Sequence, residues 1–151
     1  MEKITLTKPD DWHLHLRGGS AMKSVVGMSA LQMARAVIMP NLSPPIRVVS
    51  QAIDYHKEIM SALPIESTFN PLMVLYLTDS TTKNEIIEAS EAQEVHAVKF
   101  YPAGATTNSD SGVTNLLSAY PAIEQMQKEG LPLLIHGEVT DIDIDIFDRE
   151  K

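Results

Sequence analysis

The sequence alternates short apolar runs with longer segments of helical periodicity, and this alternation limits the chain to few folds. Apolar runs that end in turn residues predict β-strands, here over residues 10–16, 35–41, 69–78, 97–101 and 131–138. Apolar residues spaced three and four apart predict helices, here over residues 22–34, 48–63, 82–93 and 115–130. The order βαβαβαβαβ is typical of a parallel sheet covered by helices. We expect Pro121 to break the last helix and Gly130 to end it.

Composition excludes several classes of protein. The 151 residues contain no cysteine, which removes disulfides, thiolate nucleophiles and cysteine-based zinc sites. The net charge of −8 argues against nucleic acid as a partner. No apolar run approaches the roughly 18 residues of a membrane-spanning helix, and the N-terminus lacks the apolar core of a secretion signal. We therefore expect a cytoplasmic protein, with residues 1–151 in a single unit that acts on small molecules and not on membranes.

The first predicted strand carries two histidines near its end. In parallel α/β proteins the chemistry gathers at the carboxyl ends of the strands. His13 and His15 are two positions apart, so in a strand they project from the same face, together with Arg17. Imidazoles about 6.6 Å apart along one face can converge on a single metal ion. The alternative explanation is a strand end whose histidines are merely solvated or hydrogen-bonded.

A lysine interrupts the apolar run of the fourth predicted strand. Lys99 lies between Val98 and Phe100, where an uncompensated ammonium group would cost several kcal/mol. One explanation is structural, namely a side chain that reaches solvent or forms a buried ion pair. The other is an amine of lowered pKa that reacts with carbon dioxide. The resulting carbamate is an anionic oxygen ligand that can bridge two metal ions.

Other strand ends carry Asn41 and His136, whereas the two remaining histidines have different settings. His56 lies within a predicted helix and His96 precedes a predicted strand. We therefore assign His56 and His96 structural or surface roles.

Several segments, taken in order, resemble the amidohydrolase superfamily and within it the bacterial single-function dihydroorotases. They are DDWHLHLR, VIMPN, PLMVLYLTD, AVKFYPAGATTNS, PLLIHGEVT and DIDIFDRE. The resemblance runs almost from end to end of the chain. It implies a metal-dependent (β/α)8 barrel, present here as an N-terminal part of about five βα units. It also implies the reversible interconversion of N-carbamoyl-L-aspartate and L-dihydroorotate in pyrimidine biosynthesis, and a homodimer for the complete protein.

The resemblance assigns metal ligands to four residues of this chain. His13 and His15 match the pair that binds the more buried of two zinc ions. Lys99 matches the carboxylated lysine that bridges the two ions, and His136 matches a ligand of the second. The implied reaction is zinc-assisted hydrolysis of a cyclic amide, or its reverse.

The resemblance also assigns substrate ligands. Arg17 and Asn41 match residues that hold the substrate carboxylate, a role that suits the two-pronged geometry of a guanidinium group. Thr106 and Thr107 match hydroxyl groups of a mobile loop over the substrate. The composition of this loop, rich in glycine, serine, threonine and asparagine, is compatible with such motion.

The sequence departs from the family at one position and in its length. Gly18 stands where the family usually has aspartate, which we expect to loosen the loop without removing a ligand. Only five of eight βα units are present, so a further zinc histidine and the acid/base aspartate are expected in a missing C-terminal part. No catalytic acid or base is therefore assigned in this chain. We expect the acidic run Asp141, Asp143, Asp145 and Asp148 to begin the next helix as a solvated face.

Two other functions are compatible with the sequence. One is a neighbouring cyclic-amide hydrolase such as a hydantoinase or allantoinase, although the ATTNS loop and the Arg17 and Asn41 pair argue against it. The other is a dihydroorotase-like protein that has lost its activity and acts as a binding partner.

Overall fold

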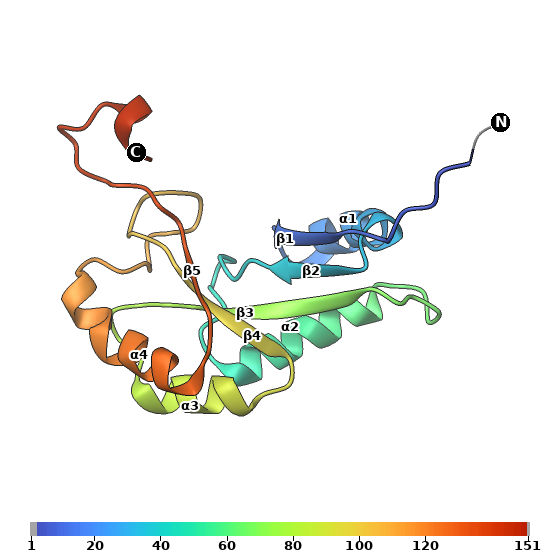
Figure 1. Cartoon of the computed structure of the whole chain (residues 1–151), viewed down its shortest axis with the longest axis horizontal. Helices are drawn as coiled ribbons and strands as arrows, with labels where there is room; N and C mark the ends of the chain where they lie inside the picture. Colours follow the sequence, from blue (N-terminus) through green and yellow to red (C-terminus); the bar gives the residue numbers. More distant parts are fainter. Residues whose placement is uncertain (1–2, 151) are drawn as a thin grey trace.

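The predicted alternation of strands and helices is confirmed in a computed structural model that describes residues 3–150 (Figure 1). In chain order the elements are β1 (Asp10–Leu14), α1 (Gly19–Gln32), β2 (Arg35–Ile38), α2 (Val49–Ser61), β3 (Asn70–Tyr76), α3 (Lys83–Glu91), β4 (Val95–Phe100), α4 (Leu116–Glu129) and β5 (Leu133–Ile135). All four strand pairs are parallel, and the order across the sheet, β1-β2-β3-β4-β5, is the order along the chain. His96, expected to precede β4, is instead its second residue.

The two faces of the sheet bury their side chains in different ways. On one face, strand residues such as Ile38, Leu75 and Val98 join the main hydrophobic core with residues from all four helices. The opposite face carries a smaller apolar cluster, formed by Val37, Met39, Leu72, Val74 and Ala97. Strands that are buried on both faces have continuous apolar sequences. This double burial explains why β2 and β3 are recognisable in the sequence as apolar runs, whereas His96 and Lys99 interrupt β4.

Local residues set the ends of two helices. Thr82 caps α3, because its hydroxyl accepts the Glu85 N–H at 3.2 Å while the Glu85 carboxylate accepts the Thr82 N–H at 2.7 Å. Gly130 ends α4 with a φ of 68°, in the left-handed region that glycine adopts without strain. The expectation that Pro121 breaks α4 is wrong, since the helix runs through it. Pro121 lies in the second turn on the exposed side, so its ring displaces little besides one backbone hydrogen bond.

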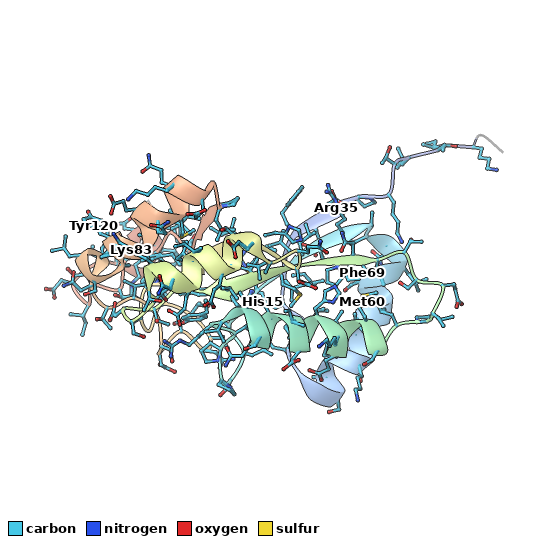
Figure 2. All side chains as sticks on the ribbon, turned by 90° about the horizontal axis from the view of Figure 1, so that it is seen from below. His15, Arg35, Met60, Phe69, Lys83 and Tyr120 are labelled. Atoms are coloured by element: carbon cyan, nitrogen blue, oxygen red, sulfur yellow. The ribbon has the colours of Figure 1, made fainter. Side chains whose placement is uncertain are left out.

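The two edges of the sheet are less covered than its centre. Large apolar side chains are exposed on α1 (Val25, Met28, Leu31), on α4 (Leu116, Leu117, Tyr120) and beyond β5 (Ile142, Ile146, Phe147). Figure 2 looks onto the helices and shows Tyr120 and Lys83 toward one end of the molecule and Met60 and Phe69 toward the other. The segment after β5 extends away from the sheet (Figure 1).

The acidic run beyond β5 does not begin an α-helix within residues 3–150. Only a short 3-10 turn, Ile146–Asp148, forms there, capped by Asp145. All four aspartates of the run are exposed, as expected of a solvated segment. No helix in the described part of the chain combines the length and apolar character needed to cross a membrane.

Candidate metal and substrate site

The predicted site residues gather at the carboxyl end of the sheet. His13 lies in β1 and His15 directly follows it; Lys99 is the next-to-last residue of β4, and His136 directly follows β5. Leu14 and Leu16 contact the helix-side core, so the alternation of the strand directs His13 and His15 to the opposite face. Lys99 lies two residues after Ala97 and shares the face of the smaller apolar cluster. This shared face places the two histidines at the end of β1 and the lysine of β4 on the same side of the sheet.

The imidazoles of His13 and His15 lie against one another. Their Nε2 atoms are 3.1 Å apart, a hydrogen-bond distance that is also compatible with the alternative of a merely hydrogen-bonded pair. Burial, followed by the charge of Lys99, lowers the pKa of His13, and burial, followed by His13, lowers the pKa of His15. Both rings therefore favour the neutral form that can ligate a metal. Two nitrogen ligands of a tetrahedral zinc ion lie about 3.3 Å apart when each bond is about 2.0–2.1 Å, so the observed spacing fits one ion.

Lys99 is buried without a compensating anion. The residue is 3% exposed. Among residues 3–150, its ammonium group forms no ion pair. The ring of Tyr101 lies beside the ammonium group, with Nζ 5.2 Å from the ring centroid. Burial lowers the pKa of Lys99 and so increases the fraction of neutral, nucleophilic amine. This environment disfavours the ion-pair explanation and is compatible with a reactive lysine.

His136 lies near the other residues but has a partner of its own. Its Nε2 is 2.8 Å from a carboxylate oxygen of Glu138, a contact that the sequence analysis did not anticipate. The charge of His136 acts on His13, so the two histidines are within electrostatic range. Within residues 3–150, however, no three side chains of histidine, cysteine, aspartate or glutamate form a ready metal cluster. The described geometry thus pairs His13 with His15, while His136 is paired with Glu138.

Arg17 occupies an unusual backbone conformation directly after the histidine pair. Its φ of 64° lies in the left-handed region, which costs a non-glycine residue of order 1 kcal/mol or more. The Tyr55 hydroxyl from α2 donates a hydrogen bond to the Arg17 carbonyl oxygen. Burial raises the pKa of Tyr55, so this donor keeps its proton. The contact fixes the backbone of Arg17, while the residue as a whole is exposed.

Asn41 is held by the loop that contains the two predicted threonines. Its side-chain N–H donates to the Thr107 carbonyl oxygen at 2.8 Å, and the Asn108 side-chain N–H donates to the Asn41 carbonyl oxygen at 3.0 Å. The side-chain oxygen of Asn41 is buried and has no hydrogen-bond partner in the described structure. Thr106 and Thr107 themselves are exposed. The structure therefore brings the loop onto Asn41 through main-chain and amide groups.

Polar and backbone contacts anchor this loop. Ser109 is buried and its hydroxyl donates to the Thr106 carbonyl oxygen at 2.6 Å. Gly112 passes so close to the main chain that a Cβ atom there would lie 2.5 Å from the Tyr101 carbonyl oxygen. Only glycine fits at that point. The loop is thus tied to the residue that directly follows β4.

Two tyrosines complete the surroundings of Lys99 and were not identified from the sequence. Tyr76 is the register partner of Lys99 on β3, and its ring stacks on Tyr101 with centroids 5.1 Å apart. The Tyr101 ring centroid lies 5.9 Å from that of His136. The signal that could have revealed Tyr101 is its position two residues after Lys99, which keeps it on the same face of an extended chain.

Comparison with known proteins yields a consistent set of relatives. The dihydroorotase of Acaryochloris marina is 58% identical over 151 residues, which are 100% of this chain and 44% of the relative. The dihydroorotase of Cupriavidus necator is 60% identical over 149 residues, or 99% of this chain and 43% of the relative. No protein-family model matches the chain. The chain thus spans less than half the length of these curated relatives.

Solved structures show the same relationship. A dihydroorotase from Campylobacter jejuni superposes with a TM-score of 0.85 and 36% identity, over 95% of this chain and 41% of that one. The Saccharomyces cerevisiae dihydroorotase in complex with 5-fluoroorotic acid gives a TM-score of 0.82 and 36% identity, over 94% and 41%. An L-hydantoinase from Arthrobacter aurescens, at 11% identity and a TM-score of 0.66, shares the fold.

The fold and the strand-end residues together define an incomplete (β/α)8 barrel of the amidohydrolase type, with five parallel strands. Within that class, the chain is a relative of the dihydroorotases and matches part of their length.

Proposed function

We propose that this chain forms the metal-binding and carboxylate-binding part of a zinc-dependent dihydroorotase, which interconverts L-dihydroorotate and N-carbamoyl-L-aspartate in pyrimidine biosynthesis. The observation that carries the proposal is the pair of imidazoles whose Nε2 atoms lie 3.1 Å apart, in electrostatic range of a buried lysine that forms no ion pair among the described residues. The relatives are named dihydroorotases, and the chain spans less than half of their length.

Four residues would hold two zinc ions. His13 and His15 would bind one ion, and Lys99, as a carbamate, would link it to a second ion bound by His136. To form the carbamate, the neutral Lys99 amine makes an N–C bond to carbon dioxide and releases a proton to solvent. His136 would either exchange its contact with Glu138 or bind through Nδ1, since Nε2 is engaged. When bound, zinc supplies Lewis acidity toward the carbonyl oxygen of a cyclic amide.

The substrate carboxylate would be bound by Arg17 and Asn41. A guanidinium group can give the carboxylate two parallel hydrogen bonds. The Asn41 side-chain N–H is already donated to the Thr107 carbonyl, so the substrate competes with the loop for this donor. Release of that contact would free the loop and allow the hydroxyls of Thr106 and Thr107 to reach the substrate.

The remaining features of the proposal concern the whole protein. The acid that protonates the departing nitrogen is assigned to no residue of this chain, and residues 1–151 would form a single portion of the barrel. We expect small molecules as the only substrates, with neither nucleic acid nor membrane as a partner. We also expect a homodimer and a cytoplasmic location for the complete enzyme.

A chimera tests the proposal directly. The segment of the Acaryochloris marina dihydroorotase that matches this chain would be replaced by residues 1–151, and dihydroorotate hydrolysis would be followed by absorbance. We expect zinc-dependent turnover in the chimera and none in the isolated 151-residue chain. The matched control is the chimera with His13→Ala and His15→Ala, which should fold yet bind less zinc. A well-folded, zinc-loaded chimera without turnover would refute the proposal.

The same chimera separates the alternatives. Hydantoin and allantoin serve as competing substrates, and a preference for either would assign the chain to a neighbouring cyclic-amide hydrolase. Stable association of the chain with another enzyme of pyrimidine synthesis, without turnover in the chimera, would favour an inactive binding partner.

A further inference from the structure

Tyr101 carries a buried hydroxyl group that the proposed function does not yet use. The residue is 1% exposed, and its hydroxyl has no hydrogen-bond partner among the described residues. Among residues 3–150, only one other buried side-chain nitrogen or oxygen atom lacks a hydrogen-bond partner. This atom is the side-chain oxygen of Asn41. Buried polar groups in proteins are nearly always paired. An unpaired hydroxyl at a candidate site therefore indicates a position where a bound group belongs.

The groups around Tyr101 favour an anion as that partner. The Lys99 Nζ lies 5.2 Å from the centroid of its ring, and the His136 ring centroid lies 5.9 Å away. The positive charge of Arg17 also acts on the phenol, and Glu138, a carboxylate beside this group, is already paired with His136 Nε2 at 2.8 Å. A tyrosine phenol carries a proton at neutral pH and can serve as a donor. A donor among three basic side chains is complementary to a carboxylate-type oxygen.

We propose that the Tyr101 hydroxyl donates a hydrogen bond to a carboxylate-type oxygen that enters the site, which makes Tyr101 a positioning residue for this group. The inference rests on the proposed function, because that function supplies two such oxygens. One source is the carbamate formed on Lys99, and the other is the carboxylate of the substrate. The hydroxyl is screened from solvent, so a group that forms inside the site is the favoured source.

A pair of tyrosine variants isolates the hydroxyl. Tyr101→Phe removes it and keeps the ring that stacks on Tyr76. Tyr76→Phe is the matched control, because it removes a phenol of the same stack whose hydroxyl contacts the Asn108 carbonyl at 3.4 Å. Removal of an unpaired buried hydroxyl leaves no group unsatisfied. We therefore expect the Tyr101→Phe chain without added ligand to unfold at a temperature no lower than that of the wild type.

Two probes distinguish the sources of the oxygen. In the first arm, the full 151-residue chain takes up zinc chloride in the presence of ¹³C-bicarbonate, and the carbamate carbon is observed by NMR. In the second, calorimetry measures the binding of N-carbamoyl-L-aspartate to the zinc-loaded chain. A hydrogen bond to a charged group corresponds to roughly a 10- to 100-fold change in affinity. We expect Tyr101→Phe to weaken carbamate formation by about that factor and Tyr76→Phe to change it little.

Each outcome has a defined meaning. A loss confined to the second arm supports the hydrogen bond and assigns its acceptor to the substrate carboxylate. Equal behaviour of Tyr101→Phe and Tyr76→Phe in both arms would overturn the inference, as would a large loss of stability in the ligand-free Tyr101→Phe chain. In that case normal zinc and carbamate uptake by the wild type would leave the proposed function standing. The same measurements are repeated on the chimera, and a wild-type chimera that takes up neither probe would overturn both.

Discussion

The centre of the sheet and its two edges differ in almost every structural respect. Six of the seven residues of β3 are buried, and β2 and β4 are nearly as well covered. In β1 and β5, by contrast, each residue is exposed or only partly covered. The candidate site draws on both regions, since Lys99 lies in the centre while His13, His15 and His136 lie at the edges. The stable centre therefore positions the lysine, and the edges supply the imidazoles.

This comparison teaches that burial and ligation have different requirements. A reactive amine needs a dry environment to lower its pKa, which the centre provides. Imidazole ligands need only partial burial and free ring nitrogens, which an edge can provide. The following substitutions test the comparison, from the largest expected effect to the smallest.

Among these substitutions, Lys99→Met should show the largest difference between its effect on activity and its effect on the free energy of unfolding. In the dihydroorotase chimera we expect activity to fall at least about 1,000-fold, equivalent to roughly 4 kcal/mol, because the bridging carbamate cannot form. The free energy of unfolding should be unchanged or higher, since methionine fills similar space without a buried charge. Steady-state kinetics measures the activity, zinc analysis the metal content, and chemical denaturation the free energy of unfolding. Retained activity with two zinc ions would mean that Lys99 has only a structural role.

Leu75→Ala should show how firmly the centre is packed. Leu75 on β3 is 2% exposed, so its truncation should cost about 2–5 kcal/mol in the free energy of unfolding. Ile135→Ala on β5 is the matched edge variant; because Ile135 is 61% exposed, it should cost less than about 0.5 kcal/mol. Urea denaturation of both variants checks the difference. Similar losses in the two would contradict the distinction between centre and edge.

Thr82→Ala should weaken α3, which covers the centre. The substitution removes the side-chain cap of the helix and leaves the Glu85 N–H without its partner. We expect a loss of about 1 kcal/mol in the free energy of unfolding. Thr82→Ser retains the hydroxyl and should behave like the wild type in thermal denaturation. Equal losses in the serine and alanine variants would exclude the cap as the cause.

Gly18→Asp should strengthen α1, which lies at the edge. Gly18 is the N-cap of α1 and provides no side-chain hydrogen bond, while its extended backbone accepts any residue. A Cβ atom there would lie 3.6 Å from the nearest atom, a Leu42 side-chain carbon, which is ordinary contact. We expect a gain of a few tenths of a kcal/mol. Gly18→Ala controls for the added Cβ atom. An equal gain in the free energy of unfolding of Gly18→Ala would rule out side-chain capping as the cause.

The sequence was sufficient to predict the sheet and the strand-end residues, because both follow from local periodicity. Because β2 and β3 are buried on both faces, they can be recognised in the sequence as apolar runs. The two-residue spacing of His13 and His15 places both side chains on the same face of a strand. The contact between Tyr55 and Arg17 could not be predicted, since it joins residues 38 positions apart. The same holds for Asn41 and Thr107, which are 66 positions apart. Such contacts depend on how the helices and loops pack, which periodicity does not encode.

Some errors had a local origin. Pro121 was expected to break α4, but its position on the exposed side of the second turn makes it tolerable. His96 was placed before its strand, because boundaries depend on tertiary pairing as well as on side-chain type. Glu138 beside His136 could have been anticipated, since the two lie two positions apart.

The nearest-neighbour order of the strands has a consequence for the time at which the site forms. Each strand pairs with the one made just before it, so the sheet can grow during synthesis without waiting for a distant segment. The ribosome delivers His13 and His15 first, Lys99 later and His136 last. We therefore expect a nascent chain to display its imidazole pair well before the lysine is buried. The direction of translation would then set the order in which ligands become available to a metal ion.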